Sequence, residues 1–253
     1  MANTDVGVAA GGLGKTIAAA IVQFNKAAVT PDLVSMVAAV KGSNTVQFPV
    51  YSKLAVSAVT NEATGDEDTE VSATSITTAA TSVEILRNHI NARVTDLAAH
   101  GNADALMVNA GQVLGNAVAA EFDANICARF DAFATSKGTS TEGLRFLDIM
   151  DAVASLEAND APRPYAAVLH PQQMYGSFGL SNELGQVAAV NGSNGAFAGG
   201  TSAAEAFLSA GFVTSMAGVN FYTSPQVIDG ADATEKKGAV FAKTALGAGY
   251  LDF

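Results

Sequence analysis

A stripe of apolar residues predicts one long helix over residues 102–134. The members of this stripe recur at steps of four and, at the end, of three: Leu106, Ala110, Leu114, Val118, Phe122, Ile126, Phe130 and Phe133. On a helix with about 3.6 residues per turn, such a series winds slowly around the surface, and Asn102 is placed to cap its start. The steps do not alternate between three and four as they do in a coiled coil. We therefore expect a spine helix, about 50 Å long, that lies across a sheet.

A two-residue alternation predicts an extended hairpin nearer the N-terminus. Between residues 44 and 60 one apolar series recurs at even spacing, namely Val46, Phe48, Val50, Leu54, Val56 and Ala58. Pro49 marks this strand as an edge. The acidic segment NEATGDEDTE at 61–70 is followed by a β-branched run at 71–78, which predicts the returning strand. Because a two-stranded hairpin is marginally stable alone in water, we expect this one to lie on a partner.

The rest of the pattern mixes short helices and strands without a regular βαβ rhythm. Helices are predicted over 16–28, 31–40, 141–158 and 202–209, with Thr30 and Pro31 opening the second and a helical turn following Pro171. Strands are predicted over 165–169 and 239–244, with a hairpin-like pair within 211–225 and a Gly-rich loop at 191–201. The predicted fold class is therefore α+β.

In this order the elements resemble those of the major capsid proteins of tailed bacteriophages, which have the Hong Kong 97-type shell fold. The most specific local matches are APRPYAAVLHPQQMYGSF at 161–178, GFVTSMAGVNFYTSPQV at 211–227 and GAVFAKTALG at 238–247. The resemblance implies five parts: an N-terminal arm (1–44), an extended hairpin loop (45–82), a peripheral domain with the spine helix (83–158), an axial domain (159–228) and a returning C-terminal strand (229–253).

The function implied by this resemblance is self-assembly. Capsid proteins of this kind form pentamers and hexamers around the axial domain and close into an icosahedral shell around double-stranded DNA, which they do not bind sequence-specifically. The implied partners are further copies of the chain, together with scaffolding, portal or cement proteins. The implied location is the virion, after assembly in the host cytoplasm. Because only residues 1–44 precede the hairpin, we expect a separate scaffold or none.

Composition and charge agree with such a shell protein. The net charge of −11 disfavours broad contact with phosphates, and only 15% of the residues are charged, whereas fifty are alanine. No Lys or Arg occurs between Pro164 and Glu235, so we expect neighbouring chains to cover much of that segment. The longest apolar run near the N-terminus, residues 17–22, is too short for a membrane span or a secretory signal.

The segment AAGGLGKT at 9–16 resembles a phosphate-binding loop, which requires G-x-x-x-x-G-K-[ST]. Gly14, Lys15 and Thr16 fit the motif, but Ala9 replaces its first glycine, and neither a preceding central strand nor a following magnesium carboxylate is evident. We interpret Gly11, Gly12 and Gly14 instead as a hinge, which lets the arm bend differently in pentamers and hexamers.

No catalytic apparatus is evident in the sequence. The three histidines, His89, His100 and His170, share no metal-ligand spacing. The single cysteine, Cys127, lies within the predicted spine helix and is expected to be a buried structural thiol. We therefore predict no enzyme activity, no cofactor and no metal.

The acidic tip of the hairpin is the one charged feature with a candidate role. It is either a solvated loop that keeps the edges from pairing indiscriminately, or a set of carboxylates that dock on arginines of an adjacent subunit. The candidate acidic residues are Glu62, Asp66, Glu67, Asp68 and Glu70. The candidate basic partners are Arg87, Arg93, Arg129 and Arg145.

Three alternatives to a phage shell remain open. A bacterial encapsulin-type nanocompartment would have the same fold and enclose cargo protein instead of DNA. A P-loop nucleotide-binding protein would use the segment at 9–16. An extracellular filament or surface-layer protein would account for the Ala, Thr and Ser content, but the irregular order of strands and helices argues against it.

Overall fold

The fold is known from a computed structural model of the chain. The structure describes residues 6–40, 42–51, 75–86, 88–90, 96–139, 142–177, 179–180, 215–216, 218–230 and 235–251. The chain divides into two compact units, a larger one formed by residues 1–35 and 89–246 and a smaller one formed by 36–88 and 247–253. The mixture of helices and strands is compatible with the predicted α+β class.

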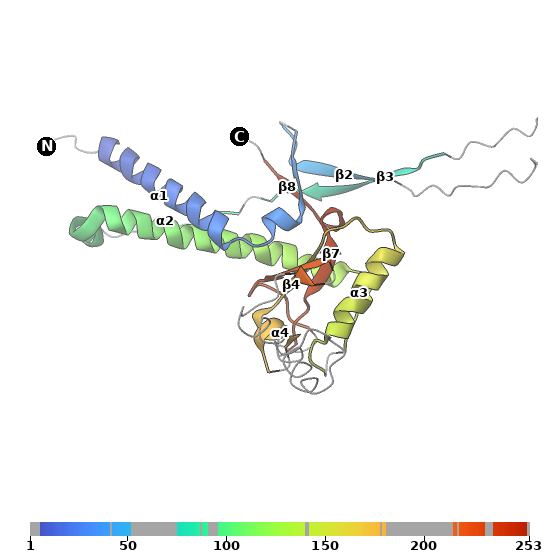
Figure 1. Cartoon of the computed structure of the whole chain (residues 1–253). Coiled ribbons are helices and arrows are strands. Elements are labelled where there is room, and N and C mark those ends of the chain that lie inside the picture. The colour runs from blue at the N-terminus through green and yellow to red at the C-terminus, as the bar shows by residue number, and fades with distance from the viewer. Residues whose placement is uncertain are drawn as a thin grey trace, which may run out of the picture. The chain divides into compact units, whose positions relative to one another are not determined.

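Two long helices run side by side in the larger unit (Figure 1). Helix α1 spans Val6–Ala27 and helix α2 spans Asp96–Cys127. Their contacts advance in the same direction along both helices, from Thr16 with Met107 to Phe24 with Phe122, so the two helices are parallel. With 32 residues, α2 is about 48 Å long, close to the length expected from the stripe.

Both long helices differ from their predicted bounds. The pattern predicts a helix over 16–28, but α1 already begins at Val6, because no proline in the Ala- and Gly-rich segment before Thr16 interrupts it. The spine helix begins at Asp96 and not at Asn102, which lies inside α2. Its last predicted turn, Ala128–Ala132, is the 3₁₀ helix η3.

A four-stranded sheet forms the centre of the larger unit. Its strands are β5 (Ser215–Met216), β6 (Val219–Thr223), β4 (Tyr165–Leu169) and β7 (Ala239–Ala242), in this spatial order. β4 pairs parallel to β6 and antiparallel to β7, while β5 and β6 are antiparallel. Gly218, between β5 and β6, has a φ of 79°, which favours glycine. The predicted hairpin-like pair is thus present.

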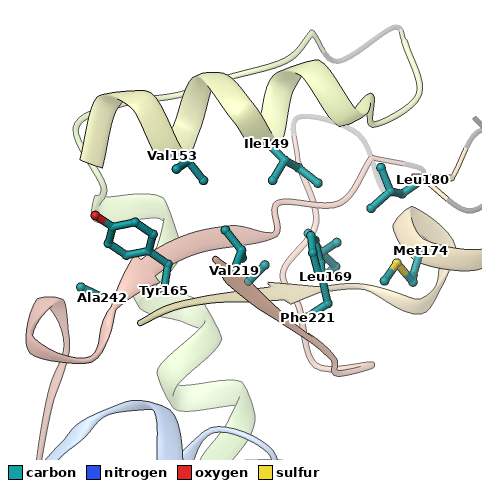
Figure 2. Close-up of a cluster of buried hydrophobic side chains, with 10 residues drawn as sticks. Ile149, Val153, Tyr165, Leu169, Met174, Leu180, Val219, Phe221 and Ala242 are labelled. Carbon is teal, nitrogen blue, oxygen red and sulfur yellow. The ribbon is translucent and has the colours of Figure 1, made fainter. Parts of the chain in front are cut away.

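One face of this sheet packs on helix α3, which spans Phe146–Ala158 (Figure 2). Ile149 and Val153 of α3 point toward the sheet, where Tyr165 and Leu169 of β4 and Phe221 of β6 lie in the same buried cluster. All five residues of β4 are buried, as expected of a central strand with both faces covered. The prediction of a buried strand over 165–169 is confirmed with the same bounds.

The opposite face of the sheet meets the C-terminal end of the spine. The ring of Phe241, in β7, lies 5.7 Å from that of Phe130 and 6.1 Å from that of Phe133. The earlier turns of α2 pack on α1 instead. The expectation that the whole spine lies across a sheet is therefore wrong. The physical reason is that α1 approaches α2 where its side chains are smallest, at Gly111 and Gly115, and meets the stripe at Phe122.

Three further elements of the larger unit refine the sequence-based bounds. α3 begins at Phe146 and not at residue 141, because the backbone N–H of Arg145 donates to Asp148 Oδ2 at 3.0 Å and caps the helix there. The predicted turn after Pro171 is helix α4, Pro171–Tyr175. The strand predicted over 239–244 ends at Ala242 and continues as the 3₁₀ helix η4, Lys243–Ala245.

The smaller unit contains the two arms of the predicted hairpin. β2 (Thr45–Tyr51) pairs antiparallel with β3 (Thr78–Glu84), with Val46 opposite Val83. The described returning strand thus begins at Thr78, the last residue of the predicted run at 71–78, and extends beyond it to Glu84, in a register that places Val46 opposite Val83. Residues 52–74 lie outside the described part of the chain.

A second strand pair in the smaller unit joins β1 (Ser35–Ala38) and β8 (Gly247–Tyr250). The helix predicted over 31–40 is limited to the 3₁₀ turn η1, Pro31–Leu33, because the residues after it pair with β8. β8 packs on β2: a Cβ added at Gly247 would come within 2.6 Å of the Phe48 ring. This glycine lets the two strand pairs approach closely.

Candidate functional site

Most of the predicted interface residues lie outside the described part of the chain. This applies to all five acidic residues of the tip, which are Glu62, Asp66, Glu67, Asp68 and Glu70. It applies equally to Arg87 and Arg93. The pairing of an acidic tip with arginines of a neighbouring subunit therefore stays a prediction.

The two remaining arginines are exposed in the larger unit. Arg129 lies in η3. Arg145 precedes α3, and its guanidinium forms an ion pair with Glu142 at 2.7 Å and a longer one with Asp148 at 3.9 Å. Its side chain keeps 52% of its surface accessible, so these intrachain contacts leave it open to a further carboxylate.

The segment resembling a phosphate-binding loop is helical. Gly11, Gly12 and Gly14 lie inside α1, as do Lys15 and Thr16. A P-loop needs a non-helical glycine-rich loop between a strand and a helix so that its N–H groups converge on phosphates, and here those groups belong to a continuous helix. The Thr16 hydroxyl donates to the Met107 carbonyl oxygen at 3.2 Å. The helical conformation of this segment is therefore inconsistent with a P-loop. The hinge interpretation stays a prediction.

The contact between α1 and α2 is a seam of small residues that the sequence reading missed. A Cβ added at Gly111 would lie 2.4 Å from the Thr16 carbonyl oxygen, and one added at Gly115 would lie 2.4 Å from that of Ala20. Ala119, one turn further on, is buried with 1% of its surface exposed. The signal was present in the sequence as small residues at 111, 115 and 119, a spacing that lets helix backbones approach closely.

The outer side of α1 carries exposed apolar side chains. Ile17, Ile21 and Val22 have 50%, 56% and 54% of their surfaces exposed. The same helix contains Lys15 and Lys26 but no acidic residue. Isolated exposed apolar residues are common. Three within six residues, on a helix whose other side packs on α2, form a cluster of the kind found on surfaces that bind a partner.

Cys127 is buried as predicted. Its side chain has no exposed surface, and burial, followed by the neighbouring charge of Asp123, raises the pKa of its thiol to about 12. A hydrogen bond with Ser224 acts in the opposite direction. The thiolate, which is the reactive form, is thus strongly disfavoured.

His170 caps the short helix α4. Its Nδ1 accepts a hydrogen bond from the Gln172 backbone N–H at 3.1 Å. The backbone N–H of His170 donates to Gln173 Oε1 at 3.0 Å. Burial, and then the charge of Lys236, lowers the pKa of the imidazole, with Asp229 opposing. The neutral ring is the form that accepts the capping bond.

We expect acidification to weaken the larger unit through His170. Because its pKa is lower in the folded than in the unfolded chain, the unfolded chain binds the proton first, and the free energy of unfolding falls as the pH drops through about 6.5. The loss attributable to this residue is less than about 1 kcal/mol. Thermal unfolding of the wild type and of His170→Asn at pH 7.5 and 5.5 measures it. Asparagine can cap without titrating, so an unchanged pH dependence in the variant would assign the effect to other groups.

No three His, Cys, Asp or Glu side chains in the described part of the chain are arranged to hold a metal ion. None of its helices is long and apolar enough to cross a membrane.

Comparison with solved structures relates this fold to a bacteriophage. The chain is similar to one from Mycobacterium phage Che8, with 18% sequence identity and a TM-score of 0.57, and the match covers 88% of this chain and 76% of that one. No protein-family model and no curated protein matches the sequence. At this identity the likeness concerns the fold, which is thus similar to that of a bacteriophage protein.

Proposed function

We propose that this chain is the major capsid protein of a tailed bacteriophage with a Hong Kong 97-type fold. In this proposal it assembles as pentamers and hexamers into an icosahedral shell around double-stranded DNA, and its activity is assembly and not catalysis. The observation that carries the proposal is the likeness to a phage chain over 88% of the sequence. The order of arm, hairpin, spine helix and mixed sheet agrees with that assignment.

Exposed apolar residues in both units support burial between subunits. In the smaller unit, Val50, Tyr51 and Ile76 have 55%, 65% and 59% of their surfaces exposed, and Leu86 has 76%. The outer side of α1 adds three more in the larger unit. Large exposed apolar groups that recur on several elements are typical of surfaces that associate.

Electron microscopy of the purified full-length protein tests the proposal. We expect closed icosahedral shells, alone or after co-expression with the phage's scaffolding protein. Their contents separate the two shell functions, since nuclease-protected DNA in particles from infected cells supports a capsid, whereas an enclosed cargo enzyme would indicate an encapsulin-type compartment. Monomers in every condition would contradict both.

A surface variant of α1 should block shell formation without unfolding the subunit. Ile17→Glu together with Ile21→Glu places two charges on exposed positions, so the free energy of unfolding should change by less than about 1 kcal/mol. Desolvating those charges in a subunit contact should prevent assembly. Sedimentation velocity and microscopy measure the shell fraction.

The matched control adds the same charges at exposed polar positions of the helix pair, as Asn25→Glu with Gln112→Glu. This control should assemble like the wild type. If Ile17→Glu with Ile21→Glu also gave the shell yield of the wild type, the outer side of α1 would not take part in assembly.

A further inference from the structure

A small set of buried polar side chains joins the end of α1 to the spine helix. Thr30, Asp123 and Ser224 have 0%, 3% and 0% of their surfaces exposed, and they are the buried polar or charged residues of the described chain. Asp123 lies on α2, and Cys127 follows it one turn later. The position of an ionisable carboxyl group in this interior calls for an explanation, because buried charges are costly unless they are well paired.

The carboxylate of Asp123 is held almost entirely by the segment that follows α1. The Val29 backbone N–H donates to both of its oxygens, at 3.2 and 3.1 Å, and the Thr30 backbone N–H donates to Oδ1 at 3.0 Å. The Thr30 hydroxyl donates to the same oxygen at 2.7 Å. Three donors from two adjacent residues therefore converge on one acidic side chain.

No cation balances this charge within the described chain. No Lys, Arg or His there forms an ion pair with Asp123. The ionisable group beside it is Cys127, whose thiol stays neutral, while Lys26 of α1, Asp32 of η1 and Glu121 of α2 are exposed. The donors of residues 29 and 30 therefore satisfy this buried carboxylate, and the position of those residues depends in turn on its oxygens as acceptors.

The rest of α1 is held by weaker contacts. Along the seam, small residues and backbone atoms touch, and the polar links given by the structure are Thr16 to Met107 and the exposed bond from Gln23 Nε2 to Asn116 Oδ1 at 2.9 Å. A single edge-on pair, Phe24 with Phe122, adds a larger apolar contact. The charge-assisted bonds of Asp123 are therefore a strong, buried polar attachment of the arm to the spine.

We infer that Asp123 is a latch for the N-terminal helix: the hydrogen bonds that its carboxylate accepts from Val29 and Thr30 hold α1 on α2, and α1 is released as one unit when they are lost. A carboxylate accepts from all three donors at once, whereas an amide in its place would bring N–H groups toward donors that already converge there. This attachment lies within one subunit and does not depend on shell formation.

Hydrogen exchange of the unassembled full-length subunit tests the latch. In Asp123→Asn, whose side chain has the same shape but no charge, we expect the protection of amides 16–27 to fall about 10- to 100-fold, the equivalent of losing hydrogen bonds to a charged group. Protection of amides 165–169 in β4 should change less than about 3-fold. Thr30→Val removes a single donor and should produce a smaller loss confined to the same amides.

The matched control is Asp32→Asn, an exposed carboxylate two residues beyond Thr30, which should leave α1 protected. Parallel loss of protection in α1 and β4, or a variant that fails to fold, would make Asp123 a general structural residue and overturn the latch. Full protection of α1 in both Asp123→Asn and Thr30→Val would overturn it as well.

Discussion

Replacing Phe241 by alanine is expected to lower the free energy of unfolding of the larger unit by about 3–5 kcal/mol. The side chain has 1% of its surface exposed, and its ring meets Phe130 and Phe133 on the face of the sheet opposite α3. The substitution leaves a cavity between the sheet and the end of the spine, and it removes two aromatic contacts. Urea unfolding of the unassembled subunit, followed by circular dichroism, measures the loss.

Leu147→Ala is the matched control for the loss of a large apolar side chain. Leu147 lies on α3 with 64% of its surface exposed, so its truncation should change the free energy of unfolding by less than about 0.5 kcal/mol. If Phe241→Ala lowered the free energy of unfolding no more than this control, the described packing of the spine on the sheet at Phe241 would be contradicted.

Alanine at Gly115 is expected to destabilise the chain by about 1–3 kcal/mol, although alanine normally favours a helix over glycine by up to about 1 kcal/mol. The sign reverses because the new Cβ would lie 2.4 Å from the Ala20 carbonyl oxygen, a backbone atom that moves only if α1 moves. Gly111→Ala faces the same obstacle at Thr16, and the double variant should separate the two helices. Thermal unfolding together with hydrogen exchange of α1 measures both effects.

Gly14→Ala provides the contrast within the same helix pair. Nothing lies within 4 Å of a Cβ added at this position, so helix propensity alone applies and the variant should be stabilised by up to about 1 kcal/mol. The hinge interpretation adds a separate expectation, namely that alanine at Gly11, Gly12 and Gly14 together impairs assembly while α1 becomes more stable. Destabilisation by Gly14→Ala equal to that of Gly115→Ala would refute the seam.

The sequence predicts most elements of the larger unit, because periodicity reports how apolar side chains face a core. The run at 165–169 is apolar throughout, and β4 is buried on both faces. The same reasoning predicted the wrong packing partner for the spine helix, a sheet and not α1. The seam with α1 is formed where side chains are absent, at Gly111 and Gly115. Hydrophobicity scales score side chains, so they do not indicate a contact that glycine backbone atoms make.

The candidate site was less predictable than the fold. An acidic segment shows where charge is concentrated, but not which surface it meets. Asp123 illustrates the opposite difficulty, because a single Asp within a helix resembles any solvent-facing residue. Its burial follows from the return of residues 29 and 30 to α2, 93 positions away in sequence in the case of Thr30. Such long-range polar pairing leaves no local pattern.

The place of β7 in the sheet has a consequence for biosynthesis. β7 pairs with β4 but is translated more than 60 residues later, and it supplies the ring that packs on Phe130. Until β7 has been translated, it can neither pair with β4 nor pack on Phe130, so the central sheet closes only after this strand has emerged. A chain released early would lack this closing strand, and the fold would thereby exclude truncated products from any assembly that requires the finished sheet.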